Sequence, residues 1–222
     1  MRERLRRINY WAVAVVVLLA LLGFMTIRDF DWPKIIEDWR PNVVFVSAVV
    51  AALSLAFAAW SFARTKTLER QAATLEAWAT WSERVRKERL LINSHLPFDG
   101  LSTEQAIALA TPSAAVTNRH GVELSLKEKS ELLDAVLAVL NGLEHIAAGV
   151  RCNLYRHDIL IMVGGTVIVS NWQRFSPYIE ETRQRSVANT KQRRAWIQLE
   201  RLVDHIKAKR ESEDKKAKLR GD

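Results

Sequence analysis

Two long apolar runs, residues 8–27 and 43–63, occupy the first third of the 222-residue chain. Neither run carries an acidic or basic side chain, and each has about the twenty residues that a helix needs to cross the hydrocarbon core of a bilayer. Because such a segment must satisfy its backbone hydrogen bonds internally, both runs are predicted to be transmembrane helices. A cleaved signal peptide competes for the first run, but its apolar stretch exceeds a typical signal core.

Aromatic side chains stand near the ends of these runs and between them, where Trp and Tyr favour the membrane–water interface. The predicted interface anchors are Tyr10, Trp11, Trp32, Trp39 and Trp60. Lys and Arg cluster before the first run and after the second, which predicts that both ends face the cytoplasm. Residues 1–64 are therefore predicted to form a transmembrane hairpin. Its outer loop, residues 28–42, contains Pro33, which is placed to begin a short helix.

Small residues recur along the second predicted span and would let another helix approach closely. They are Ala48, Ala52, Ala56 and Ala59. Alanine is common in any membrane helix, so this stripe is either background or a contact with the first span or a second copy. The lack of charged residues in both spans argues against a transporter or a monomeric channel.

Residues 65–222 have the composition of a helical cytoplasmic domain, and the chain as a whole is predicted to be all-α. Helical spacing of apolar residues predicts a stalk helix over 65–94, interrupted at Pro97 and Gly100. Capping boxes, Ser102 with Gln105 and Ser125 with Glu128, predict two further helix starts. The second opens the best-patterned helix in the chain, whose apolar face is wide enough to be core.

The last third is less clear. Composition leaves residues 159–169 open between helix and strand. Ser176 and Pro177 resemble a cap and a first helical residue, which predicts a helix start there. A final helix is predicted from Lys191, with an apolar face that includes Trp196.

Positive charge is concentrated near the end of the chain, where residues 183–222 hold thirteen Lys or Arg against six Asp or Glu. This basic tail is either a solvated helix end or a contact with anionic lipid headgroups. Nucleic acid is a weaker alternative, because the charges are not accompanied by a binding motif or by aromatic residues for base stacking.

The motifs of common enzyme classes, such as HExxH, the Walker A loop, GxSxG, GxGxxG and paired cysteines, do not occur. We therefore predict a non-enzymatic protein without a cofactor or metal. The single cysteine, Cys152, agrees with a reducing cytosol. The most informative polar residues are Asn141, Glu144 and Arg151 on the apolar helix, because a carboxylate on a core-facing helix needs a partner. Arg151, Arg183 and Arg185 are candidate partners of Glu144. The group is either a structural network or a ligand site.

Three sequence stretches, LNGLEHIAAGVR, CNLYRHDIL and NWQRFSPYIEETR, resemble a family of uncharacterised bacterial proteins, domain of unknown function 4760. The resemblance covers roughly residues 123–206. It implies a membrane-anchored helical domain in the bacterial inner membrane, with helix over 159–172. It also implies a shared pattern of residues, and it implies no activity. The pattern comprises Asn141, Glu144, Arg151, Asp158, Trp172, Pro177 and Arg183, of which all but Trp172 and Pro177 form the predicted polar network.

We interpret the chain as a membrane-anchored adaptor or sensor that binds a protein partner or a second copy of itself. The residues Trp78, Trp81 and Trp196 are candidate interface anchors, since Trp is enriched at interface hot spots; filling the domain core is the alternative. A second hypothesis is a defence or toxin-like effector whose hairpins permeabilise the bilayer. The third is a ligand-binding or hydrolytic domain that uses Glu144 and Arg151.

Overall fold

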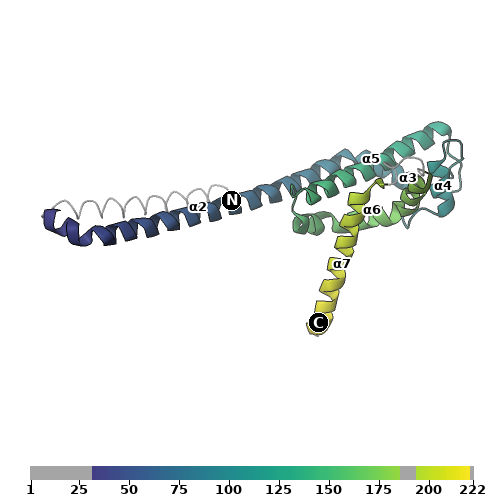
Figure 1. Ribbon diagram of the computed structural model, residues 1–222. Helices are drawn as coiled ribbons and strands as arrows, with labels where there is room; N and C mark the ends of the chain where they lie inside the picture. The colour runs from purple at the N-terminus through teal and green to yellow at the C-terminus, as the bar shows by residue number, and fades with distance from the viewer. Residues whose placement is uncertain (1–31, 186–193, 221–222) are drawn as a thin grey trace. The chain divides into compact units, whose positions relative to one another are not determined.

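The computed structural model describes residues 32–185 and 194–220, which form six α-helices (Figure 1). They are α2 (Trp32–Arg84), α3 (Arg86–His95), α4 (Thr103–Ala110), α5 (Leu126–Arg151), α6 (His157–Arg185) and α7 (Ile197–Arg220). The described residues thus confirm the all-α prediction. The first predicted span, with Tyr10 and Trp11, lies outside them.

The chain divides into two compact units, Met1–Phe62 and Ala63–Asp222. The described part of the first unit is helix, and it contains the second predicted span. Its large apolar side chains are exposed, among them Leu55 at 73% and Phe62 at 67%. Helix α2 is long and apolar enough to cross a membrane. Helix α5 also meets this test, but it forms the core of the second unit.

The predicted outer loop is partly wrong, because α2 already begins at Trp32 and continues through Trp39 into the apolar run. Pro33 lies in its first turn, where proline's missing N–H costs no helical hydrogen bond. The predicted short helix is therefore the beginning of α2. Trp60, the third described anchor, is 56% exposed.

In the second unit the predicted stalk is two helices, because α2 ends at Arg84 and α3 begins at Arg86. Val85 between them is 1% exposed, and its N–H and C=O still bond to Trp81 and Arg89. Gly100, at φ +131°, lies in the predicted interruption and adopts a backbone conformation that other residues rarely reach. Residues 65–94 are thus helical, with a one-residue break at Val85.

Helix α5 is the centre of the second unit and lies against α3, α6 and α7. Both predicted capping boxes are formed, at Ser102 for α4 and at Ser125 for α5. Burying apolar side chains is the main favourable term in folding, and the largest fully buried ones come from five helices. They include Ile92, Leu109, Leu132, Leu140, Leu143, Leu160, Ile168, Phe175, Ile179, Leu199 and Ile206.

Helix α6 resolves the ambiguity over residues 159–169, which are helical. The predicted helix start at Pro177 is wrong, because Pro177 lies inside α6. Proline cannot donate to the carbonyl of Gln173, four residues earlier. The hydroxyl of Ser176 donates to that carbonyl at 3.2 Å instead, so the helix continues without leaving it unsatisfied.

Two buried cations hold the loops of the second unit. Lys129 is 5% exposed, and its ammonium donates to the carbonyls of Thr111 at 2.5 Å and Ala114 at 2.6 Å. Arg174 is 9% exposed and donates to Asn93 Oδ1 at 2.7 Å and to the Leu96 carbonyl at 2.9 Å. Burial lowers the pKa of both groups.

Candidate functional site

The first turn of α7 is held by a side chain from another helix. Helix N-termini present backbone N–H groups without intrahelical partners. Glu144 of α5 accepts the N–H of Gln198 at 3.1 Å through Oε1 and that of Leu199 at 2.7 Å through Oε2. Trp196, which precedes α7, has φ +55° and offers no capping oxygen of its own. Glu144 therefore caps α7 from outside.

Three neighbouring side chains hold the same segment. Asn141 Oδ1 accepts the indole N–H of Trp196 at 3.0 Å. Arg151 donates to the side-chain oxygen of Gln198 at 3.0 Å. From α6, the guanidinium of Arg183 donates to the Ala195 carbonyl at 2.7 and 3.0 Å and forms an ion pair with Glu200 at 3.0 Å. Residues 195–200 are thus bound from both α5 and α6; we call this the α7 clasp.

Four of the five predicted polar residues meet in the α7 clasp: Asn141, Glu144, Arg151 and Arg183. The pairs predicted within that set are not formed, because Glu144 bonds to backbone N–H groups rather than to Arg151 or Arg183. Gln198 and Glu200 also take part, although the sequence pattern did not predict them as partners. The missing cap before α7 was the only signal, since RRAWIQLE offers no Ser, Thr, Asp or Asn there.

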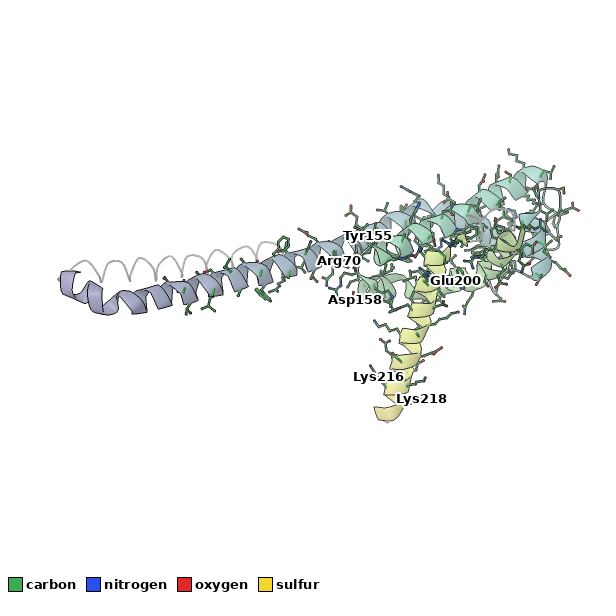
Figure 2. All side chains as sticks on the ribbon, in the orientation of Figure 1. Arg70, Tyr155, Asp158, Glu200, Lys216 and Lys218 are labelled. Carbon is green, nitrogen blue, oxygen red and sulfur yellow. The ribbon has the colours of Figure 1, made fainter. Side chains whose placement is uncertain are left out.

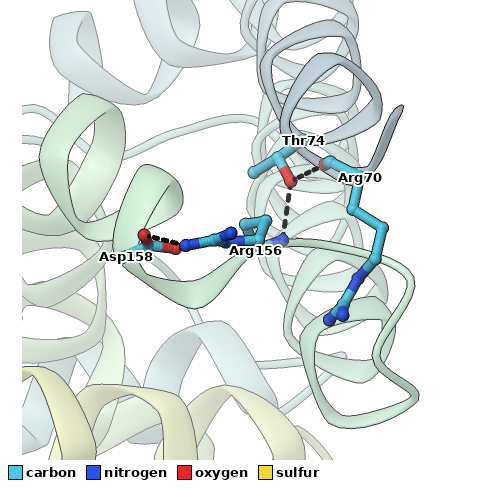
Figure 3. Close-up of polar contacts among 4 residues, drawn as sticks. All are labelled: Arg70, Thr74, Arg156 and Asp158. Carbon is cyan, nitrogen blue, oxygen red and sulfur yellow. Dashed lines mark hydrogen bonds and ion pairs between the residues drawn. The ribbon is translucent and has the colours of Figure 1, made fainter. Parts of the chain in front are cut away.

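Asp158, the fifth predicted residue, lies elsewhere. It accepts from Arg156 through both carboxylate oxygens, at 2.9 and 2.5 Å (Figure 3). This hydrogen-bonded pair lowers the pKa of Asp158 to about 2. The backbone N–H of Arg156 donates to Thr74 Oγ1 at 2.7 Å, and Arg70 donates to Asn153 Oδ1 at 3.1 Å. The turn between α5 and α6 is therefore bound to α2.

The three candidate interface tryptophans belong largely to the core, which favours the core alternative of the two interpretations. Trp81 and Trp196 are 5% and 7% exposed, and Trp78 is partly buried against the core. Trp78 and Trp81 lie with ring centroids 4.8 Å apart. Each ring packs on a glycine, Trp78 on Gly164 of α6 and Trp81 on Gly142 of α5. An added Cβ there would come within 2.5 Å of the ring, so these glycines permit the close approach.

An open groove of about 560 Å³ runs between the end of α2, α3 and α5. Its polar lining includes Arg84, Glu88, Asn141 and His145. Asn141 therefore belongs both to the groove and to the α7 clasp. Among the described residues, no group of three or more His, Cys, Asp or Glu is arranged to hold a metal ion. The groove therefore offers both charged and neutral hydrogen-bonding groups.

The family model for the domain of unknown function (DUF4760) matches residues 48–206. The chain belongs to the DUF4760 family. The match extends beyond residues 123–206, where the resemblance was noted, and includes much of the apolar part of α2. Both the exposed apolar helix and the helical unit are thus part of the DUF4760 pattern. Neither a curated protein nor a solved structure matches the chain.

Proposed function

We propose that this protein is an inner-membrane anchor carrying a non-enzymatic cytoplasmic module, which pairs with a second copy of the chain through α2. The two apolar runs would be the spans, with both termini on the cytoplasmic side. The exposed apolar surface of residues 47–62 supports this, because soluble proteins rarely expose so continuous an apolar surface.

The observation that carries the pairing lies on α2 within the second unit. Its buried face, with Thr74 and Trp81, packs onto the core. The other face presents Leu68 and Leu75, 47% and 48% exposed. The exposed residues Ala72 and Ala79 extend this stripe. Spacings of four, three and four residues are those of a coiled-coil seam, with Leu at the d positions and Ala at the a positions of a parallel pair.

Charge complementarity supports the parallel arrangement. With Leu68 at d, Arg64 occupies a g position and Glu69 the e position of the following heptad. In a parallel coiled coil, a g residue of one helix can form a salt bridge with this e residue of the other helix. Both side chains are exposed. Two copies inserted in one membrane would already have parallel α2 helices. A stripe as short as this one then benefits from the high effective concentration that anchoring provides.

Disulfide cross-linking tests the pairing in membranes. In a Cys152→Ser background, Leu75→Cys places a thiol on the seam, and mild oxidation is expected to give a covalent dimer. Thr80→Cys is the matched control, because Thr80 is exposed on the same helix but off the stripe. Equal cross-linking at both positions, or none at position 75, would refute the seam.

The permeabilising alternative makes a different prediction. An effector of that kind would release dye from loaded vesicles that contain the full-length chain, whereas a paired anchor would leave the vesicles sealed. Carbonate washing of membranes tests anchoring independently, because an integral protein stays in the pellet. The basic tail supports a further contact with anionic lipid headgroups, since residues 211–218 at the end of α7 are all exposed.

A further inference from the structure

The turn between α5 and α6, residues 152–156, lies beside the first turns of α2 in the second unit. Figure 2 shows Arg70, Tyr155 and Asp158 at the same end of the helical unit, and Figure 3 shows the contacts that hold the turn there. Thr74 is 1% exposed and accepts from the N–H of Arg156, while its own hydroxyl donates to the Arg70 carbonyl at 2.6 Å. The turn is therefore fixed to α2.

This attachment holds the turn against the part of α2 that follows Ala63, the first residue of the second unit. Arg70 is seven residues beyond Ala63, and at 1.5 Å per residue the separation along the helix is about 10 Å. That distance is roughly one Debye length at physiological salt. Charges on the turn would therefore act on lipid headgroups around the span.

The exposed side chains of this region are those that an anionic membrane surface attracts. Among residues 63–70 and 151–158 the exposed cations are Arg64, Lys66 and Arg151, against the exposed carboxylates Glu69 and Asp158. The other two cations, Arg70 and Arg156, are half-buried. Leu154, at the tip of the turn, is 61% exposed. An apolar side chain among cations is the combination by which peripheral segments enter the interface, the cations lying at the headgroups and the apolar group just below them.

We propose that the α5–α6 turn docks on the anionic headgroup surface of the bilayer, with Leu154 entering the interface. This inference rests on the proposed membrane anchor. It concerns a face of the second unit different from the Leu68–Leu75 seam, because Thr74 and Arg70 contact the turn from the opposite side of α2. A lipid surface is favoured over an acidic protein because the anchor keeps lipid permanently within reach.

The chain carries its own probe for this contact. Cys152 is the only cysteine and is exposed at the start of the turn. The full-length protein, labelled at Cys152 with an environment-sensitive fluorophore, would be incorporated into nanodiscs of phosphatidylcholine alone or with phosphatidylglycerol. A nitroxide-labelled lipid then reports proximity by quenching. Co-elution of the protein with the discs measures membrane anchoring independently. A protein that does not co-elute would contradict the proposed function rather than the docking of the turn.

We expect quenching to be at least about three-fold stronger in the anionic discs, because each basic residue near an anionic surface contributes attraction. Salt at 0.5 M should reduce the difference, since it shortens the Debye length. Absence of quenching in co-eluting discs would overturn the docking. Equal quenching in both disc types would overturn the assignment to an anionic surface.

Matched variants separate the turn from the rest of the chain. Leu154→Ser should reduce the quenching, whereas Leu126→Ser should leave it unchanged, because Leu126 is 74% exposed at the opposite end of α5. Both variants should melt as the parent does. Replacing Lys215, Lys216 and Lys218 of the tail by Gln should also leave the quenching in place. Loss of quenching in the tail variant would overturn the assignment to the turn.

Discussion

The carboxylate of Glu144 accepts the backbone N–H of Leu199 at 2.7 Å, so that a side chain of α5 caps the first turn of α7. Its second oxygen accepts the N–H of Gln198, and the two contacts fix where α7 begins against the core. Glu144 was predicted to pair with a charged side chain. In the structure it fixes the position of another helix instead.

Replacing Glu144 by Ala should lower the free energy of unfolding by about 1–3 kcal/mol, because two N–H groups lose a charged acceptor. If Glu144 had instead paired with a buried arginine, its removal would have left that guanidinium without a partner and cost about 3–5 kcal/mol. Arg183 instead keeps its contacts with Ala195 and Glu200. Denaturant unfolding of the detergent-solubilised protein measures the change.

Glu131→Ala is the control for this variant, since Glu131 lies on α5 and forms an ion pair with exposed Lys127 at 3.9 Å. A surface pair of this kind contributes less than about 1 kcal/mol. A loss as large as that of Glu144→Ala would show that charge on α5, rather than the cap, is being measured.

Adjacent glycines of α6 should respond oppositely to alanine. A Cβ at Gly164 would lie within 2.5 Å of the Trp78 ring, so Gly164→Ala should destabilise by about 1–3 kcal/mol through overpacking. At Gly165 the nearest atoms, from Arg210 and Ile161, are 3.4 Å away, which is an ordinary van der Waals contact. Gly165→Ala should therefore be neutral or gain up to about 1 kcal/mol from helix propensity. Thermal unfolding of the two variants measures the difference. Equal changes in melting temperature would contradict the contact between Gly164 and the Trp78 ring.

Which features were predictable depended on how far apart the partners lie in sequence. The boxes at Ser102 and Ser125 join residues three apart, so a local pattern revealed them. The cap by Glu144 joins residues 54 and 55 apart, and nothing near α7 identifies its partner. Ser176 before Pro177 resembled a helix start, because a serine hydroxyl can cap a helix. In the structure this hydroxyl donates back to the Gln173 carbonyl inside α6 instead.

Lys129→Met should expose the role of the buried ammonium. The methionine fills similar volume but removes the ammonium that donates to the Ala114 carbonyl. The Thr111 carbonyl loses the same donor and keeps only the N–H of Ala114, at 3.2 Å. We expect a loss of about 1–3 kcal/mol and faster proteolysis in residues 111–114. Lys127→Met is the matched control, because its side chain is 87% exposed. Unchanged proteolysis of the Lys129 variant would contradict the role of this side chain in holding the loop.

The Arg156–Asp158 pair should contribute to stability in mild acid. The pKa of Asp158 falls from 3.8 to about 2 on folding, so its contribution is complete above pH 3.8 and is lost as the pH falls through about 2. The side chain is 49% exposed, and after solvent screening we expect less than about 1 kcal/mol. Asp158→Asn should flatten the loss of stability between pH 4 and 2. If stability fell with pH in Asp158→Asn as steeply as in the parent, the Arg156–Asp158 pair would not contribute to folding stability.

His157 should make the contact between α6 and α7 sensitive to pH near neutrality. Its ring lies edge-on to that of His205, with centroids 4.2 Å apart, and its Nε2 is buried without a hydrogen-bond partner among the described residues. Burial and the nearby His205 and Lys209 lower the pKa of His157, against a smaller opposing effect of Asp158. The unfolded chain then binds the proton more readily than the folded one. Stability should therefore fall as the pH drops below about 6.5.

Replacing His157 by Phe keeps a ring against His205 but removes the titrating group. This variant should lose less stability than the parent between pH 7 and 5, measured by denaturant unfolding at each pH. His120→Gln is the control, because His120 is exposed in the loop between α4 and α5. If the His157 and His120 variants followed the same pH profile as the parent, the titration would have to be assigned to another group, and α7 would be held on α6 independently of pH.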